Sequence, residues 1–362
     1  MSGLRDRIVR LIEANGPLSI ADYMAFCLFD PKDGYYTTRE PFGASGDFTT
    51  APEISQMFGE LVAVWLLTAW RALGRPSPVT LAEIGPGRGT LMKDMLRVLG
   101  RLGPDLWGSA SVAMIETSPR LVAVQKATLG DLADRPEWHE TIDTLPRQPL
   151  LIVANELFDA IPIRQYVKAD GRWMERAVGL TEARELMFTA RPGAPDPALL
   201  PPDAATAPDG AIAELSPART ALMEMLAERV AEGGAAALLI DYGYSKPAVG
   251  DTLQGLSHHA YTDPLADPGK ADLTAHVDFS ALSEVAKAHG LDAHLLPQGE
   301  FLLRMGLLER AGQLGAAADS ATRRRLQSEV DRLAGSDGMG TLFKVLAIAP
   351  TGAPLPAFLP MQ

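Results

Sequence analysis

The residues with the clearest chemical pattern lie at the end of the first quarter of the chain. Glu83, Gly85, Gly87 and Gly89 stand in the order Glu-x-Gly-x-Gly-x-Gly. A short apolar run, 79–84, precedes the glycines and a helix-compatible stretch follows them, so the pattern predicts a strand, a loop and a helix. Glycine lets the backbone approach a ligand closely, because a Cβ would occupy ligand space or forbid a positive φ. We therefore predict that this loop binds a nucleotide-type cofactor.

The spacing of the glycines distinguishes two cofactors. The dinucleotide fingerprint is Gly-x-Gly-x-x-Gly, which disfavours an NAD enzyme here. The observed order resembles the loop of class I methyltransferases, in which the acidic residue two positions before the first glycine faces the cationic methionine end of S-adenosylmethionine. This resemblance assigns Glu83 to that end of the cofactor, although a glycine-rich turn by itself occurs in many α/β proteins.

Acidic residues follow two further predicted strands. Glu116 follows 111–115, and Asp143 follows a strand expected near 138–142. Ligands of open α/β sheets bind beyond the carboxyl ends of the strands, where an acid can hold both ribose hydroxyls. We expect Glu116 to do so, with a solvated glutamate before a helix as the alternative. In methyltransferases the position of Asp143 commonly meets the adenine.

Composition narrows the class of protein. The 362 residues are 47% hydrophobic and carry a net charge of −12, which argues against a non-specific nucleic-acid binder. The single cysteine, Cys27, cannot form an internal disulfide or a thiolate metal site. No apolar run reaches the roughly 18 residues that span a bilayer, and the N-terminus lacks the apolar core of a signal peptide. We expect a soluble protein in a reducing compartment, the cytoplasm of a bacterium or the mitochondrial matrix of a eukaryote.

From residue 79 onward, short apolar runs alternate with helical stretches. This alternation predicts an α/β, Rossmann-like fold with a doubly wound, mainly parallel sheet. We expect a helical N-terminal subdomain over 1–78 that covers substrate and cofactor, a main domain over 79–350, and a tail over 351–362. The main domain carries an insertion at 161–234, with a β-hairpin, a proline-rich loop and a helix, and a helical insertion at 299–335.

Several smaller elements are also predicted. A long apolar helix is expected from Pro52 to about Leu73. The prolines in 191–210 indicate an exposed loop. The remaining strands are expected at 150–154, 235–240, 293–296 and 341–348.

Five stretches occur together in one order and resemble the MidA family, whose mitochondrial members are respiratory complex I assembly factors and protein arginine methyltransferases. Two of them, Gly-Asp-Phe-Thr-Thr-Ala-Pro-Glu and Asn-Glu-Leu-Phe-Asp-Ala, are far more specific than the glycine loop. One departure is His258-His259, where we expect the family to carry more arginine. The five stretches are 46–53, 83–91, 155–162, 241–244 and 272–279.

The resemblance implies a class I methyltransferase that transfers methyl groups from S-adenosylmethionine to an arginine of the large quinone-site subunit of complex I. A homodimer is left open. We expect Gly46, Thr50 and Asn155 to complete the cofactor site. The alternative for a bacterial relative is another target.

Two carboxylates fit this chemistry. A guanidinium group has a pKa above about 12, so it is a poor nucleophile until a carboxylate orients it and receives its proton. Glu156 and Asp159 follow the strand expected at 150–154, and carboxylates match the guanidinium fork bidentately. We predict that they are catalytic. The alternative is that one of them caps a helix after that strand.

The substrate side is less clearly marked. Tyr35, Tyr36 and Asp47 are candidates, with both tyrosines equally explained as core aromatics. His276 is a further candidate, with an ordinary hydrogen-bonded histidine as the alternative. We expect no metal site, because the six histidines form no His-Glu-x-x-His pair and methyl displacement at a sulfonium requires no metal.

Two functions compete with arginine methylation. One is an assembly chaperone that binds a complex I subunit, with the cofactor serving structure. The other is a small-molecule methyltransferase, which the large insertion at 161–234 makes less attractive because it indicates a broad substrate surface.

Overall fold

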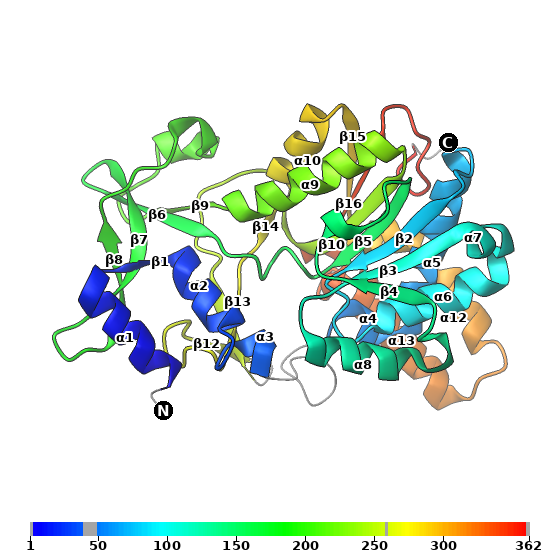
Figure 1. The fold of residues 1–362 in the computed structure, drawn as a ribbon, viewed down its shortest axis with the longest axis horizontal. Helices are drawn as coiled ribbons and strands as arrows, with labels where there is room; N and C mark the ends of the chain where they lie inside the picture. The colour runs from blue at the N-terminus through cyan, green and yellow to red at the C-terminus, as the bar shows by residue number, and fades with distance from the viewer. Residues whose placement is uncertain (1–2, 39–48, 258–259, 360–362) are drawn as a thin grey trace. The chain divides into compact units, whose positions relative to one another are not determined.

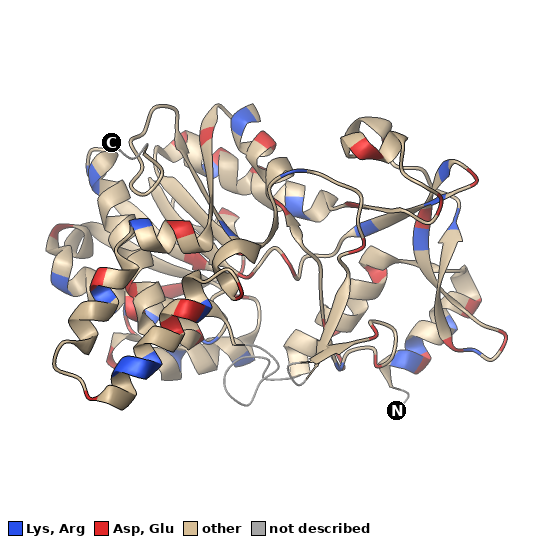
Figure 2. Cartoon of the chain, turned by 180° about the vertical axis from the view of Figure 1, so that it is seen from behind, with Lys and Arg blue, Asp and Glu red and all other residues tan. Residues whose placement is uncertain are grey.

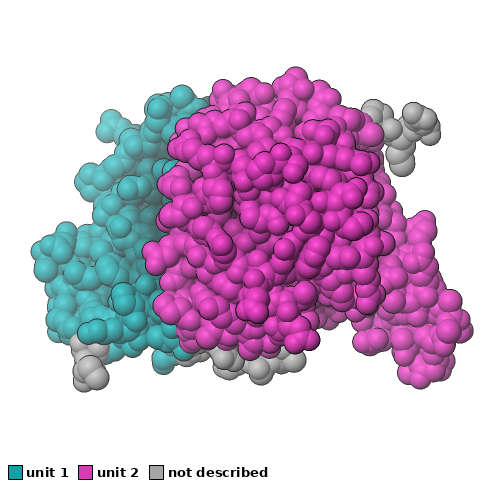
Figure 3. Space-filling model, turned by 45° about the vertical axis from the view of Figure 1, so that its right-hand side comes forward, with its two compact units in different colours: residues 1–48, 158–221, 246–278 teal, residues 49–157, 222–245, 279–362 magenta. Residues whose placement is uncertain are grey.

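The structure, a computed structural model, describes residues 3–38, 49–257 and 260–359. The chain divides into two compact units, each built from segments far apart in the sequence (Figure 3). Neither unit begins or ends at residue 78, where the sequence predicts a boundary. The predicted domain limits stay a prediction. Unit 1 comprises 1–48, 158–221 and 246–278, and unit 2 comprises 49–157, 222–245 and 279–362.

Unit 2 contains the expected doubly wound sheet. Its strands lie in the order β15-β16-β10-β5-β2-β3-β4 (Figure 1). The neighbours from β10 to β4 are parallel, whereas β16 is antiparallel to both β10 and β15. The predicted mainly parallel sheet is therefore confirmed. The strands are β2 (Val79–Ile84), β3 (Ala110–Ile115), β4 (Pro136–His139), β5 (Leu150–Asn155), β10 (Ala236–Tyr244), β15 (Leu291–Pro297) and β16 (Phe343–Pro350).

Helices surround this sheet, and α5 is its most apolar partner. Phe58 and Trp65 of α5 are fully buried in a core that includes Leu81 of β2 and Met95 of α6. Acidic and basic residues are interspersed along the helices (Figure 2). The helices are α4 (Ala51–Ile54), α5 (Gln56–Ala72), α6 (Thr90–Leu102), α7 (Pro104–Ser109), α8 (Pro119–Leu129), α10 (Phe279–Ala288), α11 (Gln298–Arg304), α12 (Leu307–Gly315), α13 (Ser320–Ala334) and α14 (Met339–Leu342), with α9 (Pro217–Gly233) beginning in unit 1.

Two predicted elements differ in the structure. The helix expected from Pro52 onward is interrupted at Ser55, whose extended backbone (φ −157°) lets its hydroxyl accept the Met57 N–H at 3.2 Å and cap α5. The strand expected near 138–142 ends at His139. Asp143 therefore lies in a short 3-10 helix, Ile142–Thr144, instead of at a strand end.

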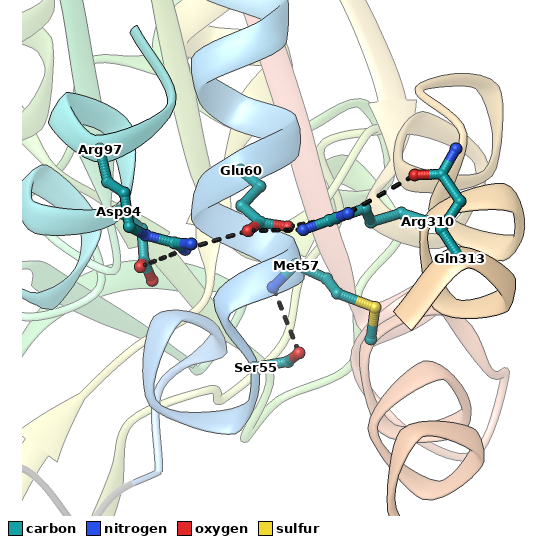
Figure 4. A network of polar contacts seen from close by, with 7 residues as sticks. All are labelled: Ser55, Met57, Glu60, Asp94, Arg97, Arg310 and Gln313. Carbon is teal, nitrogen blue, oxygen red and sulfur yellow. Dashed lines mark hydrogen bonds and ion pairs between the residues drawn. The ribbon is translucent and has the colours of Figure 1, made fainter. Parts of the chain in front are cut away.

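A buried carboxylate joins three helices of unit 2. Glu60 of α5 is 5% exposed and lies between Arg97 of α6 and Arg310 of α12 (Figure 4). Its oxygens accept from Arg97 at 3.0 Å and from Arg310 at 2.6 and 3.0 Å. A bidentate arginine pair of this kind is stronger than a neutral hydrogen bond.

Replacing Glu60 with glutamine is expected to lower the free energy of unfolding by about 1–2 kcal/mol, because two charge-assisted pairs are lost while both arginines keep partial solvent access. Urea denaturation measures the change. Glu329→Gln is the control, since Glu329 contacts the largely exposed Arg325 at 3.7 Å, and its effect should stay within about 0.5 kcal/mol. Equal losses in both variants would contradict the assigned role of Glu60.

Unit 1 is built on two small sheets. The first has the order β1-β7-β6-β9, with β8 also paired to β7, and the second has the order β12-β11-β13. The predicted hairpin is confirmed, because β6 and β7 pair antiparallel around Asp170 (φ +49°) and Gly171 (φ +71°), a turn with two positive φ angles. The strands of these two sheets are β1 (Leu18–Ser19), β6 (Arg164–Ala169), β7 (Arg172–Leu180), β8 (Leu186–Arg191), β9 (Ile212–Leu215), β11 (Gln254–Ser257), β12 (Ala260–Thr262) and β13 (Asp272–Thr274). The two-residue strand β14 (Val277–Asp278) belongs to neither of them.

Three helices complete unit 1: α1 (Leu4–Asn15), α2 (Ile20–Phe29) and α3 (Tyr35–Thr38). Tyr23 of α2 and Tyr35 of α3 are fully buried in its core. The proline-rich loop at 191–210 contains two short 3-10 helices, Pro197–Leu199 and Pro202–Ala205. Among the described residues, no helix has the length and apolarity to cross a bilayer.

Candidate active site

The glycine loop connects β2 to α6 in the conformation that its sequence predicts. Gly85, Gly87 and Gly89 have φ angles of +66°, +52° and +83°, which L-residues with side chains rarely adopt. A Cβ at Gly85 would come within 2.8 Å of Cδ1 of Leu157. Gly89 is the N-cap of α6, so the first turn of α6, whose N–H groups have no partner within the helix, directly follows the loop.

The ends of three neighbouring strands bring the predicted cofactor residues to one edge of the sheet. Ile84, the last residue of β2, pairs with Ile115 of β3 and with Ala154 of β5. The residues that follow, including Glu116 and Asn155, therefore emerge at the same edge as the glycine loop.

Glu83 is the most unusual charged group of this edge. Its side chain lies within β2, is 3% exposed, and has an oxygen, Oε2, without a hydrogen-bond partner among the described residues. Burial raises the pKa of Glu83 to about 8, partly offset by a hydrogen bond from the backbone N–H of Met92. A buried carboxylate oxygen in this state fits a cationic ligand, because a positive charge would compensate for its lost hydration.

Glu116 is held in place by neighbouring groups. Its Oε1 accepts from the Ser118 N–H at 2.8 Å, and its Oε2 accepts from Nε2 of Gln125 at 3.0 Å. Burial raises its pKa, and these hydrogen bonds act in the opposite direction. Both oxygens are thus fixed at the position where a ribose is expected.

Gln125 is a residue that sequence reasoning missed. It is fully buried on α8, with Nε2 also donating to the carbonyl of Gly87 at 2.9 Å and Oε1 accepting from the indole of Trp138 at 2.8 Å. The available signal was its spacing, since Gln125 falls between Leu121 and Leu129 on the apolar stripe of α8. A polar residue on such a stripe needs a buried partner.

Glu156 follows β5 in a strained backbone conformation. Its φ of +51° is rare for a residue with a side chain, and its N–H donates to the Ile240 carbonyl at 2.8 Å. Oε1 accepts from Nδ2 of Asn155 at 3.1 Å and from the Ala51 N–H at 3.2 Å. The carboxylate is therefore oriented from two sides, and backbone strain of this kind is concentrated at functional sites.

The segment that begins at Thr50 contacts two parts of this edge, namely Glu156 after β5 and the start of α6 after the glycine loop. Thr50 is half-buried and is the N-cap residue of α4. The following residue, Ala51, binds Glu156, and Glu53 accepts a short hydrogen bond from the Thr90 hydroxyl at the start of α6. This segment thus connects the glycine loop to Glu156. Gly46 and Asp47 lie outside the described residues.

Asp159 belongs to unit 1 and is 5% exposed. Its Oδ1 accepts the Ala160 N–H at 2.8 Å, and its carbonyl accepts from the guanidinium of Arg219 at 3.0 Å. The described residues 156–163 form turns rather than a helix, so the alternative that Glu156 or Asp159 caps a helix directly after β5 is wrong.

The remaining substrate-side candidates also lie in unit 1. The Tyr36 hydroxyl donates to Asp272 at 2.8 Å, and its pKa is raised mainly by burial and then by Asp272 and Asp159. Tyr35 is fully buried against Tyr36, as a core aromatic would be. His276 accepts at its carbonyl from Arg219 and donates its N–H to Thr252. Sequence reasoning did not select Asp272 or Arg219 as individual site residues.

Among the predicted cofactor residues, Asp143 is one whose position in the structure differs from the expectation. It is exposed in the 3-10 helix after β4 and does not follow a strand directly. A contact of Asp143 with the adenine would therefore have to come from this 3-10 helix. The sequence predicts that it comes from the end of a strand. Among the described residues, no group of three or more His, Cys, Asp or Glu side chains is placed to hold a metal ion.

Comparison with known proteins gives a consistent result. A family model described as "Putative S-adenosyl-L-methionine-dependent methyltransferase" matches residues 61–296. The chain is 36% identical over 368 residues to the mitochondrial protein arginine methyltransferase NDUFAF7 homolog of Drosophila melanogaster, covering 94% of this chain and 83% of the relative. It is 34% identical over 364 residues to the Homo sapiens protein arginine methyltransferase NDUFAF7, covering 94% and 81%.

A solved structure matches over the same extent. A crystal structure of a Burkholderia thailandensis protein bound to S-adenosyl-homocysteine is similar with a TM-score of 0.84 and 30% sequence identity, covering 98% of this chain and 94% of that protein. A native structure from the same organism gives a TM-score of 0.82. These similarities span both units of the chain.

Proposed function

This chain belongs to the family of S-adenosyl-L-methionine-dependent methyltransferases that includes the NDUFAF7 proteins, and we propose that it transfers methyl groups to arginine side chains of a protein. Family membership confirms the predicted resemblance, the predicted enzyme class and the predicted cofactor, S-adenosylmethionine. We propose arginine as the methyl acceptor because the chain is similar, over 94% of its length, to relatives named protein arginine methyltransferases.

The cofactor would supply an electrophilic methyl group on a sulfonium. Its cationic end would lie at Glu83, whose buried Oε2 lacks a partner among the described residues, and its ribose at Glu116. Gly85, Gly87 and Gly89 would let the backbone approach it.

Glu156 would orient the acceptor guanidinium and receive the proton that its nitrogen loses as the new N–C bond forms. A neutral or protonated side chain would do this poorly, because the acceptor is cationic before the transfer. The contacts of Glu156 with the Ala51 N–H and the Asn155 amide support this role, since they hold one carboxylate oxygen in a defined position. The second carboxylate expected from the sequence, that of Asp159, stays a prediction.

The finer expectations rest on the family resemblance. The main one is that the substrate is the large quinone-site subunit of complex I, whereas the possibility of a homodimer stays open. Its relatives are named as mitochondrial proteins. For this chain, the cytoplasm of a bacterium or the mitochondrial matrix of a eukaryote stays a prediction.

The experiment that tests the function incubates the purified protein and methyl-labelled S-adenosylmethionine with lysate from a strain that lacks the protein, followed by mass spectrometry. Label on an arginine of a protein is the expected result, and a complex I subunit would identify the partner. Label only on small molecules would overturn the proposal. No label despite measured cofactor binding would favour the chaperone alternative.

The raised pKa of Glu83 predicts a pH-dependent cofactor affinity. A cation favours the ionised carboxylate, so below about pH 8 the binding of S-adenosylmethionine must release a proton from Glu83. We expect the affinity to rise between pH 6 and pH 8, by at most about tenfold per unit, and then to level off. Calorimetry across this range measures it. Glu83→Gln should bind more weakly with a flatter profile, and a flat profile for the unaltered protein would contradict the assignment.

A further inference from the structure

Gln125 connects three structural elements that surround the predicted cofactor edge. One amide group on α8 bonds the glycine loop at Gly87, the end of β3 at Glu116, and β4 at Trp138, with distances of 2.9, 3.0 and 2.8 Å. The side chain is fully buried, so water does not compete for these bonds. Its contacts thus join the loop that would approach the cofactor to the acid that would hold its ribose.

The chemistry of the three partners fixes the orientation of this amide. The Trp138 indole is only a donor, whereas the Gly87 carbonyl and the Glu116 carboxylate are only acceptors. Oε1 must therefore face Trp138, and both hydrogens of Nε2 are used by Gly87 and Glu116. The reverse orientation would place three pairs of like groups against each other in a buried site: Oε1 against the Gly87 carbonyl and the Glu116 carboxylate, and Nε2 against the Trp138 N–H.

Few other side chains satisfy all three partners. A glutamate would place a second carboxylate against Glu116 and an acceptor against the Gly87 carbonyl. A methionine has nearly the same shape and would leave both acceptors and the Trp138 N–H without their partner. Each buried polar group left in this way is costly.

We propose that Gln125 is a positioning residue of the cofactor site, which holds the Glu116 carboxylate and the Gly87 carbonyl together in the geometry that receives the nucleoside part of S-adenosylmethionine. This inference rests on the use of that cofactor in the proposed function. It does not depend on the identity of the methyl acceptor.

The first test measures S-adenosylhomocysteine binding by calorimetry at pH 8 and at pH 5.5 for the full chain and for Gln125→Glu. The ionised glutamate would repel Glu116, and the protonated form would again donate a hydrogen bond. We expect the variant to bind about 10–100-fold more weakly than the unaltered protein at pH 8, with the ratio falling to about threefold at pH 5.5. A ratio that is the same at both pH values would overturn the proposal.

Gln298→Glu is the matched control. Gln298 is also fully buried in unit 2, and its amide donates to the Leu333 carbonyl on α13. Among the contacts of the described residues, none joins Gln298 to the glycine loop or to Glu116. Its dissociation constant should stay within about threefold of that of the unaltered protein at both pH values. A pH-dependent loss like that of Gln125→Glu would instead indicate a general effect of a buried charge.

A second test covers the case in which Gln125→Glu does not fold. Gln125→Met, Glu116→Ala and the double variant form a thermodynamic cycle for S-adenosylhomocysteine affinity. We expect the double variant to bind no more than about threefold more weakly than Glu116→Ala alone, because Gln125 acts partly through Glu116. Fully additive losses, or no loss for Gln125→Met, would overturn the proposal. Failure of the unaltered protein to bind would instead overturn the cofactor assignment itself, whereas failure of methyl transfer alone would leave this inference intact.

Discussion

Glu156→Gln is expected to lower the rate of methyl transfer to protein by about 10²–10⁴-fold, the range typical of a lost general base. Glutamine keeps an oxygen that can accept from Ala51 and Asn155, so the side chain retains its position. What it loses is the negative charge that orients a guanidinium and takes up its proton. Incorporation of label from S-adenosylmethionine into protein measures the rate.

Two further measurements make this result specific. Cofactor affinity, measured with S-adenosylhomocysteine, should stay within about threefold for Glu156→Gln, because the change affects the acceptor side. Glu232→Gln is the control, since Glu232 forms a surface pair with Arg147 at 3.1 Å and its loss should leave transfer unchanged. Transfer by Glu156→Gln at nearly the full rate would exclude Glu156 as the base. A parallel loss of cofactor affinity would assign Glu156 to the cofactor instead.

The parts of the site that the sequence predicts are those with local signals. The glycine loop and the acids at strand ends depend only on neighbouring residues, and β2, β3 and β5 lie where the apolar runs indicate. Their common edge follows from the parallel pairing of Ile84 with Ile115 and Ala154. Asp143 does not directly follow a strand, because β4 ends at His139 and the polar residues Glu140 and Thr141 come between them.

The parts that the sequence does not predict depend on contacts between distant segments. Gln125 has its role only because α8 brings it beside Gly87, Glu116 and Trp138. The short strands β12 and β13 each pair with β11 over three residues, and runs of this length give no clear alternation. The division into two units also cannot be predicted from the order of the elements along the chain, because each unit is assembled from three separate segments.

Gly87→Val is expected to reduce cofactor affinity by more than about 100-fold, or about 2.7 kcal/mol. Gly87 has a φ of +52°, which a β-branched residue adopts only with strain, and the added side chain would keep the backbone from approaching the proposed cofactor closely. Gly130→Val is the matched control. Gly130 caps α8 with a φ of +57°, and a Cβ there would meet no atom within 4 Å. Both variants carry similar backbone strain, of about 1–3 kcal/mol, so thermal denaturation should show comparable losses of stability. Only Gly87→Val should lose S-adenosylhomocysteine binding in calorimetry. Unchanged affinity in Gly87→Val, or an equal loss in Gly130→Val, would show that the loop does not contact the cofactor as proposed.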